Sequence, residues 1–202
     1  MLDYLNPILS IVEIVVGLGL LIFLHELGHF IMAKRNGVRV EAFSLGFGPA
    51  IWKFRRGDTE YRFSWIPRGG YVKMAGEGVG LGSGKADELT SKSAWQRFQI
   101  FAAGPAMSLL LAGLASAVAW SLDMFSFFGR GDEIFRYLAK MNFYLAAFNM
   151  VPGFPLDGGR ICRACLTVVL RDPLKATRVA TAIGQAFGTF LILLGGWAAF
   201  HG

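Results

Sequence analysis

The sequence predicts an all-α polytopic membrane protein with about four transmembrane helices and a small membrane-associated β-sheet on the cytoplasmic side. Three observations lead to this fold class. Apolar residues make up 54% of the chain and charged residues only 17%, whereas an average soluble domain has about 25% charged residues. The apolar residues form long blocks, and most basic residues lie between these blocks. One segment between two blocks alternates apolar and polar residues as a β-hairpin does.

Three apolar blocks are long enough to cross a bilayer, because a spanning helix needs about 20 apolar residues. They are residues 8–24, with a helical pattern that continues to residue 33, residues 98–122 and residues 179–200. A shorter block, residues 141–156, contains two prolines and a glycine. Broken backbone at membrane depth is tolerated where it is buried in protein or lines a wet cavity. We therefore interpret this block as a discontinuous fourth span.

The distribution of basic residues predicts the orientation in the membrane. The first basic residue is Lys34, and residues 34–97 carry twelve lysine and arginine residues against six acidic ones. Residues 158–178 are also basic, whereas residues 123–133 carry three acidic residues and one arginine. Cytoplasmic loops are enriched in basic residues. We therefore expect the two basic segments in the cytoplasm and both termini outside.

The first cytoplasmic segment has the pattern of a small sheet. Aromatic residues alternate with polar ones in two runs, 52–56 and 61–65, which are joined by a turn containing Gly57. We expect residues 38–75 to form a cytoplasmic β-sheet insertion within a single core of residues 1–202. Glycines at alternate positions predict a flexible loop over residues 76–92.

The sequence His25-Glu26-Leu27-Gly28-His29 places two histidines one turn apart on a predicted helix. Positions i and i+4 differ by about 40° around a helix axis, so both imidazoles can reach one metal ion. Glu26 is suited to act as a general base toward water. The pair lies in an apolar block, where ionisable residues are costly and usually functional. We interpret His25 and His29 as metal ligands and Glu26 as the catalytic residue.

A catalytic zinc site needs a third protein ligand and an open position. Asp157 is the first candidate, because it follows the broken apolar block at about the depth expected for His25. Glu41 is the second candidate, although a predicted helix break separates it from the histidines. Glu13 lies three turns from His25, and His201 lies beside the outer C-terminus, so neither is expected to reach the metal.

Five motifs occur in order along the chain: HELGH at 25–29, FSLGFGP at 43–49, GGYVKM at 69–74, AGP at 103–105 and NMVPGFPLDGG at 149–159. Together they resemble the site-2 protease family of intramembrane zinc metalloproteases. The resemblance extends over residues 8–200, and the first half is most similar to the bacterial regulator of sigma-E protease. The segment 123–135 is too short for the PDZ domain of that branch, so we expect a minimal catalytic core without PDZ domains.

The resemblance implies a zinc cofactor held by His25, His29 and Asp157, with Glu26 as the base. It also implies that Asn149 holds or orients the substrate backbone. The family often has asparagine where this chain has Ser108, so no role is carried over to that residue. The implied function is regulated intramembrane proteolysis, the cleavage of a transmembrane segment in a membrane-bound protein.

The expected partners are a single-pass membrane substrate, such as an anti-sigma-factor-like protein, and the lipid bilayer, but no nucleic acid. The expected location is the bacterial inner (cytoplasmic) membrane. A membrane zinc transporter or metal sensor is the alternative function, but transport predicts further polar ligands along the spans, and only Glu13 lies outward of His25. A catalytically inactive scaffold is another alternative, which would not need Glu26.

Overall fold

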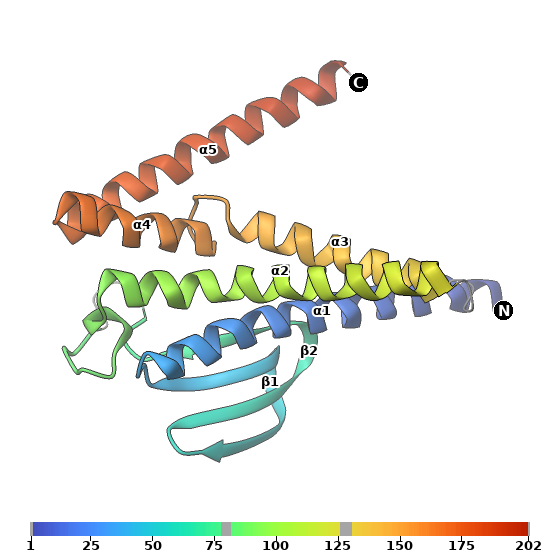
Figure 1. Ribbon diagram of the computed structural model, residues 1–202, viewed down its shortest axis with the longest axis horizontal. Coiled ribbons are helices and arrows are strands. Elements are labelled where there is room, and N and C mark those ends of the chain that lie inside the picture. Colours follow the sequence, from blue (N-terminus) through green and yellow to red (C-terminus); the bar gives the residue numbers. More distant parts are fainter. Residues whose placement is uncertain (1, 78–81, 126–130, 202) are drawn as a thin grey trace.

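The computed structural model describes residues 2–77, 82–125 and 131–201, and the side chains of residues 15–77, 82–123 and 133–200. Long helices make up most of the structure (Figure 1). One small sheet lies beside α1, between the C-terminal end of α1 and the N-terminal end of α2 in the sequence. In chain order the elements are α1 (Leu2–Arg35), β1 (Val40–Arg56), β2 (Thr59–Met74), η1 (Leu89–Ser91), α2 (Ala94–Phe125), α3 (Gly131–Asn149), α4 (Asp157–Leu170) and α5 (Pro173–His201).

Three helices in the described part of the chain are long and apolar enough to cross a membrane. The spans are Val15–Arg35 in α1, Ala94–Asp123 in α2 and Pro173–Phe200 in α5. The prediction of a mostly helical membrane protein with a small sheet is confirmed. The fourth predicted span is not among these three helices. α3 begins at Gly131, earlier than predicted, and its first turns carry charged residues that lower its hydropathy.

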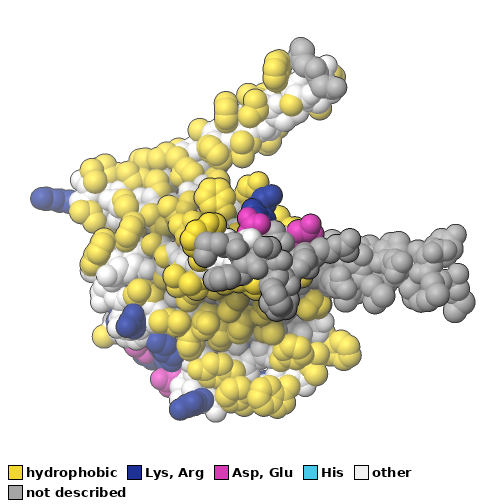
Figure 2. Space-filling view, turned by 45° about the vertical axis from the view of Figure 1, so that its right-hand side comes forward, with side chains coloured by type: hydrophobic (Ala, Val, Ile, Leu, Met, Phe, Trp, Pro, Cys, Tyr) yellow, Lys and Arg dark blue, Asp and Glu magenta, His cyan; other side chains and the backbone are white. Residues whose placement is uncertain are grey.

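The helices α1, α2 and α3 run side by side, whereas α5 packs mainly on α4 and diverges from the other long helices (Figure 1). The helical path is interrupted after α3 at residues 150–156, because Pro152 and Pro155 cannot continue a helix. A new helix, α4, then begins at Asp157. Apolar side chains cover most of the face seen in Figure 2, as expected for helices that face lipid.

The two strands pair in more places than the strands of a simple hairpin do, because each strand is long and bent. Residues near Phe43 in β1 pair on one side with Tyr61 and on the other with Val72. The sheet therefore ends in the last residues of β2 at one edge and in the second half of β1 at the other. Gly46 (φ 87°) lies at an irregular part of this pairing and adopts a conformation that favours glycine.

The core lies between the C-terminal half of α1, the sheet and the start of α2. Phe43 is central to it, since its ring stacks on Phe23 and Phe30 with centroid distances of 4.8 Å in each case. The far end of the hairpin instead exposes its aromatic residues, with Trp52 61% and Trp65 69% exposed. The buried cluster comprises Ala33, Val38, Val40, Phe43, Val72, Met74, Leu89, Ile100, Phe101 and Ile161.

The helices α1 and α2 approach each other closely at Gly28. A Cβ atom at this position would lie 2.3 Å from the carbonyl oxygen of Ala103 and 2.9 Å from Cβ of Met107. Any larger residue would push the two helices apart, because interiors pack too tightly to absorb such an overlap. Gly28 therefore sets the distance between the helix that carries the histidines and the helix that lies beside them.

Candidate metal centre

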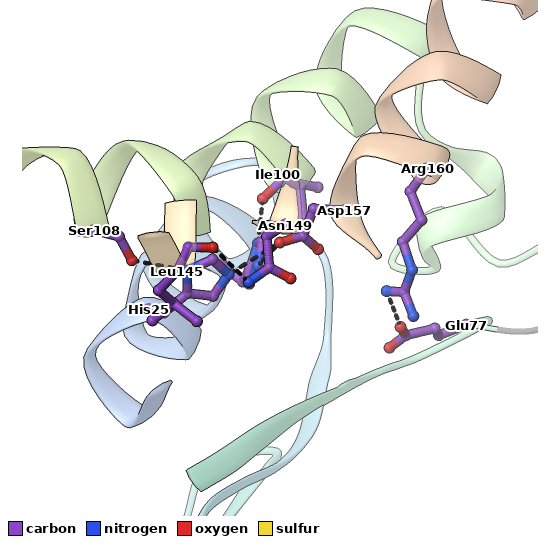
Figure 3. Close-up of polar contacts among 9 residues, drawn as sticks. His25, Glu77, Ile100, Ser108, Leu145, Asn149, Asp157 and Arg160 are labelled. Atoms are coloured by element: carbon purple, nitrogen blue, oxygen red, sulfur yellow. Dashed lines mark hydrogen bonds and ion pairs between the residues drawn. The ribbon is translucent and has the colours of Figure 1, made fainter. Parts of the chain in front are cut away.

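The structure brings His25, His29 and Asp157 together from two helices that are far apart in the sequence. The distance from Asp157 Oδ2 to His25 Nε2 is 3.0 Å, and to His29 Nε2 it is 3.1 Å. All three side chains are buried, with exposures of 3%, 5% and 8% in sequence order. They form a group of possible metal ligands whose ligand atoms lie within 4.8 Å of one another. Figure 3 shows Asp157 reaching toward His25 from the start of α4.

The non-helical segment 150–156, which precedes α4, puts Asp157 at this position. Leu156 is extended (φ −68°, ψ 159°), and Asp157 is the first residue of α4, where a carboxylate interacts favourably with the helix dipole. The following residue is glycine, and a Cβ atom at Gly158 would lie 2.3 Å from the carbonyl oxygen of Met150. The loop thus packs directly against the first turn of α4 and holds the carboxylate in place.

The Nδ1 atoms of both imidazoles, which point away from Asp157, have partners that orient the rings. His29 Nδ1 donates to the carbonyl oxygen of Ile100 at 2.7 Å, which leaves its Nε2, 3.1 Å from Asp157 Oδ2, as the nitrogen that can bind a metal. His25 Nδ1 lies 2.9 Å from Ser108 Oγ. With Nε2 of His25 as a ligand, its Nδ1–H donates to this hydroxyl. Partners of this kind fix the tautomer and the ring orientation of metal-binding histidines.

The donor set fits zinc. Zinc binds nitrogen and oxygen ligands at about 2.0–2.2 Å with tetrahedral geometry, which places ligand atoms about 3.3 Å apart. The two carboxylate–imidazole distances are close to this spacing. Two histidines, one carboxylate and one open position are the arrangement of a catalytic zinc site. Bound there, zinc would be held by Nε2 of His25, Nε2 of His29 and the Asp157 carboxylate.

A cavity of about 300 Å³ opens beside this group and contains the other two predicted site residues, Glu26 and Asn149. Val72 of β2 lines the same cavity as Glu26. Asn149 ends α3 and donates from Nδ2 to the carbonyl oxygen of Leu145 at 3.0 Å (Figure 3). The cavity therefore brings a carboxylate, an amide and an edge of the sheet to one side of the metal ligands.

Glu41, the second candidate for the third ligand, does not join the cluster. Its carboxylate lies on β1 and pairs with Lys73 at 3.0 Å and with Arg39 at 3.2 Å. The hydrogen bonds from Lys73 and Arg39 keep the pKa of the Glu41 carboxyl below its ordinary value. The side chains of Glu13 and His201 lie outside those that the structure describes.

Three further residues of the site were not assigned a role from the sequence. Ser108 and the carbonyl of Ile100 contact the histidines, as described above. Gly104 lets α2 pass over both rings, since a Cβ atom there would lie 2.2 Å from Nε2 of His29. The AGP motif at 103–105 was a signal for Gly104, but a backbone carbonyl such as that of Ile100 leaves no trace in a sequence.

A helix apolar enough to span a membrane carries two histidines of a buried His-His-Asp group. This combination is typical of the class of intramembrane metalloproteases. The model of peptidase family M50 matches residues 13–130 and 125–195, and the chain belongs to this family. A solved site-2 protease from Methanocaldococcus jannaschii superposes with a TM-score of 0.55 and 26% sequence identity. This comparison covers 91% of the present chain and 67% of the archaeal one.

Two bacterial relatives are similar to about half of the chain. The regulator of sigma-E protease RseP of Escherichia coli is 45% identical over 108 residues, which are 51% of this chain and 24% of that protein. Protease RseP of Yersinia pestis is 46% identical over 112 residues, or 52% of this chain and 24% of that protein. The chain thus spans about a quarter of the length of these relatives.

The proposed ligands can be tested by zinc content. Purified wild-type protein should carry about one zinc ion per chain, and the variants His25→Ala and Asp157→Ala should lose most of it because each lacks a ligand. Glu41→Ala should retain zinc and serves as the control. Mass spectrometry of metals in desalted protein measures this. Zinc loss in Glu41→Ala with retention in Asp157→Ala would contradict the assignment.

Ser108→Ala should weaken zinc binding by about 10- to 100-fold, because the partner that orients His25 is lost. Competition with a chelator of known affinity measures the change. Ser116→Ala, an exposed serine on the same helix, is the matched control and should bind zinc like the wild type. Equal zinc affinities for all three proteins would show that Ser108 does not position His25.

Proposed function

We propose that this protein is an intramembrane zinc metalloprotease that cleaves a transmembrane segment of a membrane-bound protein. The observation that carries the proposal is the buried His25–His29–Asp157 group, with Glu26 beside it on a helix apolar enough to span a membrane. Membership of peptidase family M50 supports the same conclusion. Ionisable residues buried at membrane depth are costly, so their convergence indicates function.

The arrangement of residues suggests how the reaction proceeds. His25, His29 and Asp157 would hold a zinc ion, which would supply Lewis acidity toward the scissile carbonyl and toward a water molecule. Glu26 accepts a proton from the attacking water and donates it to the leaving amine nitrogen. Asn149, at the rim of the same cavity, orients the substrate backbone by hydrogen bonding.

A helical substrate must unwind before its peptide bond can be attacked, and the edge of the sheet offers a place for the extended segment. Residues 71–74 form the edge strand of β2, and Tyr71, Val72 and Met74 line the metal-site cavity. An extended peptide can add to such an edge through main-chain hydrogen bonds. The substrate would then lie between β2 and Glu26, close to the metal ligands.

The membrane topology is also part of the proposal. α3 and the broken segment 150–156 form a fourth, discontinuous span, which supplies the polar path by which water reaches the site. Both termini lie outside, and the sheet insertion at 38–75 and the loop at 76–92 lie on the cytoplasmic side of a single core. The exposed tryptophans of the hairpin, Trp52 and Trp65, suit contact with the bilayer interface.

The substrate is proposed to be a single-pass membrane protein of the anti-sigma-factor type in a bacterial inner membrane. This follows from the similarity to proteins named regulators of sigma-E protease. The transporter or sensor alternative has no comparable support. In the described part of the chain, the cluster of His25, His29 and Asp157 is the only group of possible metal ligands of its kind, whereas transport requires successive sites across the spans.

Replacing the proposed base separates metal binding from catalysis. Glu26→Gln should retain zinc but lower the rate of cleavage by about 100-fold or more, because it removes general-base catalysis. Cleavage of a reconstituted transmembrane substrate, followed on gels beside a zinc assay, measures both quantities. Wild-type cleavage rates in purified Glu26→Gln protein would end the assignment of Glu26 as the base.

The docking edge can be tested with a pair of proline substitutions. Lys73→Pro interrupts the edge strand beside the cavity and should reduce cleavage several-fold to about tenfold, through lost main-chain hydrogen bonds. Lys53→Pro makes the same change at the opposite edge, in β1, and should cleave nearly normally. Lys73→Ala controls for the lost Glu41 ion pair, and thermal unfolding checks that each variant folds. Equal activity in the two proline variants would refute docking at β2.

A further inference from the structure

A second cavity, of about 220 Å³, lies next to the metal site on the side of the basic loops. It can hold more than one water molecule, since each needs about 10–15 Å³. Three arginines line it: Arg97 from the first turn of α2, and Arg160 and Arg163 from α4. The remaining lining residues are mostly apolar or small: Gly76, Glu77, Leu89, Thr90, Phe101, Phe154 and Ala164.

Two of the three arginines have no acidic partner among the described residues. Arg160 forms an ion pair with Glu77 at 2.6 Å (Figure 3) and lies over the ring of Phe101. Arg97 and Arg163 make no such pair, and the Nε atom of each is buried without a hydrogen-bond partner in the described structure. Both residues line the same cavity, so two like charges share it. Buried polar atoms without partners are rare in native proteins and need an explanation.

The position of the cavity in the fold indicates what neutralises these charges. Arg97 lies within the first turn of the candidate span Ala94–Asp123, and the ends of a span lie near the membrane interface. Trp95, two residues earlier, is 63% exposed and stacks on Phe98, as aromatic residues at an interface do. Basic pockets between membrane helices on the cytoplasmic side are suited to the phosphates of anionic lipids.

We propose that this cavity is a binding site for a phosphate anion, held by Arg97 and Arg163 with Arg160 at its inner wall. Guanidinium groups match the oxygen geometry of a phosphate and donate pairs of charge-assisted hydrogen bonds. The apolar residues Leu89, Phe154 and Ala164 line the same cavity and would accommodate the carbon chain next to a phosphodiester. The source of the phosphate is either the headgroup of an anionic lipid or free phosphate.

The site is separate from the metal ligands but adjoins them. Three residues line both cavities: Glu77, Phe101 and Arg160. Arg97 and Arg163 line the phosphate cavity but not the metal-site cavity. Their substitution therefore tests the phosphate site without altering the proposed catalytic residues. Binding is measured without substrate, so the result is independent of whether the protein is a protease.

The experiment compares the wild-type protein with the double variant Arg97→Gln/Arg163→Gln, which we call the pocket variant. Native mass spectrometry measures binding of phosphatidylglycerol and of phosphatidylcholine, and thermal unfolding is followed with inorganic phosphate against chloride at equal ionic strength. The control is Arg171→Gln/Arg178→Gln, which removes two exposed charges from the same cytoplasmic region. Wild type and control should bind phosphatidylglycerol at least about tenfold more tightly than the pocket variant, because charge-assisted hydrogen bonds are lost in that variant.

Preference for phosphatidylglycerol assigns the site to a lipid headgroup. Stabilisation by inorganic phosphate, with no preference between the two lipids, assigns the site to free phosphate. Either result supports the site if the pocket variant no longer shows it. In phosphatidylcholine alone the pocket variant should unfold at or above the wild-type temperature, because two repelling charges are gone. If it does not fold, the single variant Arg163→Gln repeats the test. Equal binding by wild type and pocket variant, or an equal loss in the control, overturns the proposal.

Discussion

The contact of one carboxylate with two imidazoles organises this structure. Asp157 lies within hydrogen-bond distance of both His25 and His29, although more than 120 residues separate it from either. These groups are buried, and burial of polar groups is favourable only when they are paired with each other or with a metal ion. The positions of α1 and α4 are therefore tied to each other through the site, and α2, which packs on both of them, must fit around it.

Small residues make that fit possible. Gly28 allows α1 and α2 to cross closely, Gly104 leaves room for the histidine rings, and Gly158 lets α4 start against the broken loop. In a membrane the association of helices depends on packing more than on the hydrophobic effect, because lipid is as apolar as the side chains. Close backbone approach thus stabilises the fold and at the same time places the ligands.

The end of the molecule that carries the sheet combines three features in a small space. The edge of β2 borders the metal-site cavity, the ion pair of Arg160 and Glu77 stands between this cavity and the proposed phosphate site, and the exposed hairpin extends beyond them. A substrate segment that reaches the site from this end would pass close to all three. Lipid phosphates, the sheet and the catalytic groups would then meet at the same membrane depth.

The apolar blocks, the break at Pro152 and Pro155, the hairpin, and the helical spacing of His25 and His29 were all readable from the sequence, because each depends on neighbours along the chain. The depth argument also selected Asp157 over Glu41. Tertiary structure alone showed that Ser108 and the carbonyl of Ile100 orient the rings, that the strands bend until β2 borders the cavity, and that Arg97 and Arg163 line one cavity. These contacts join residues distant in sequence, and helix packing decides them.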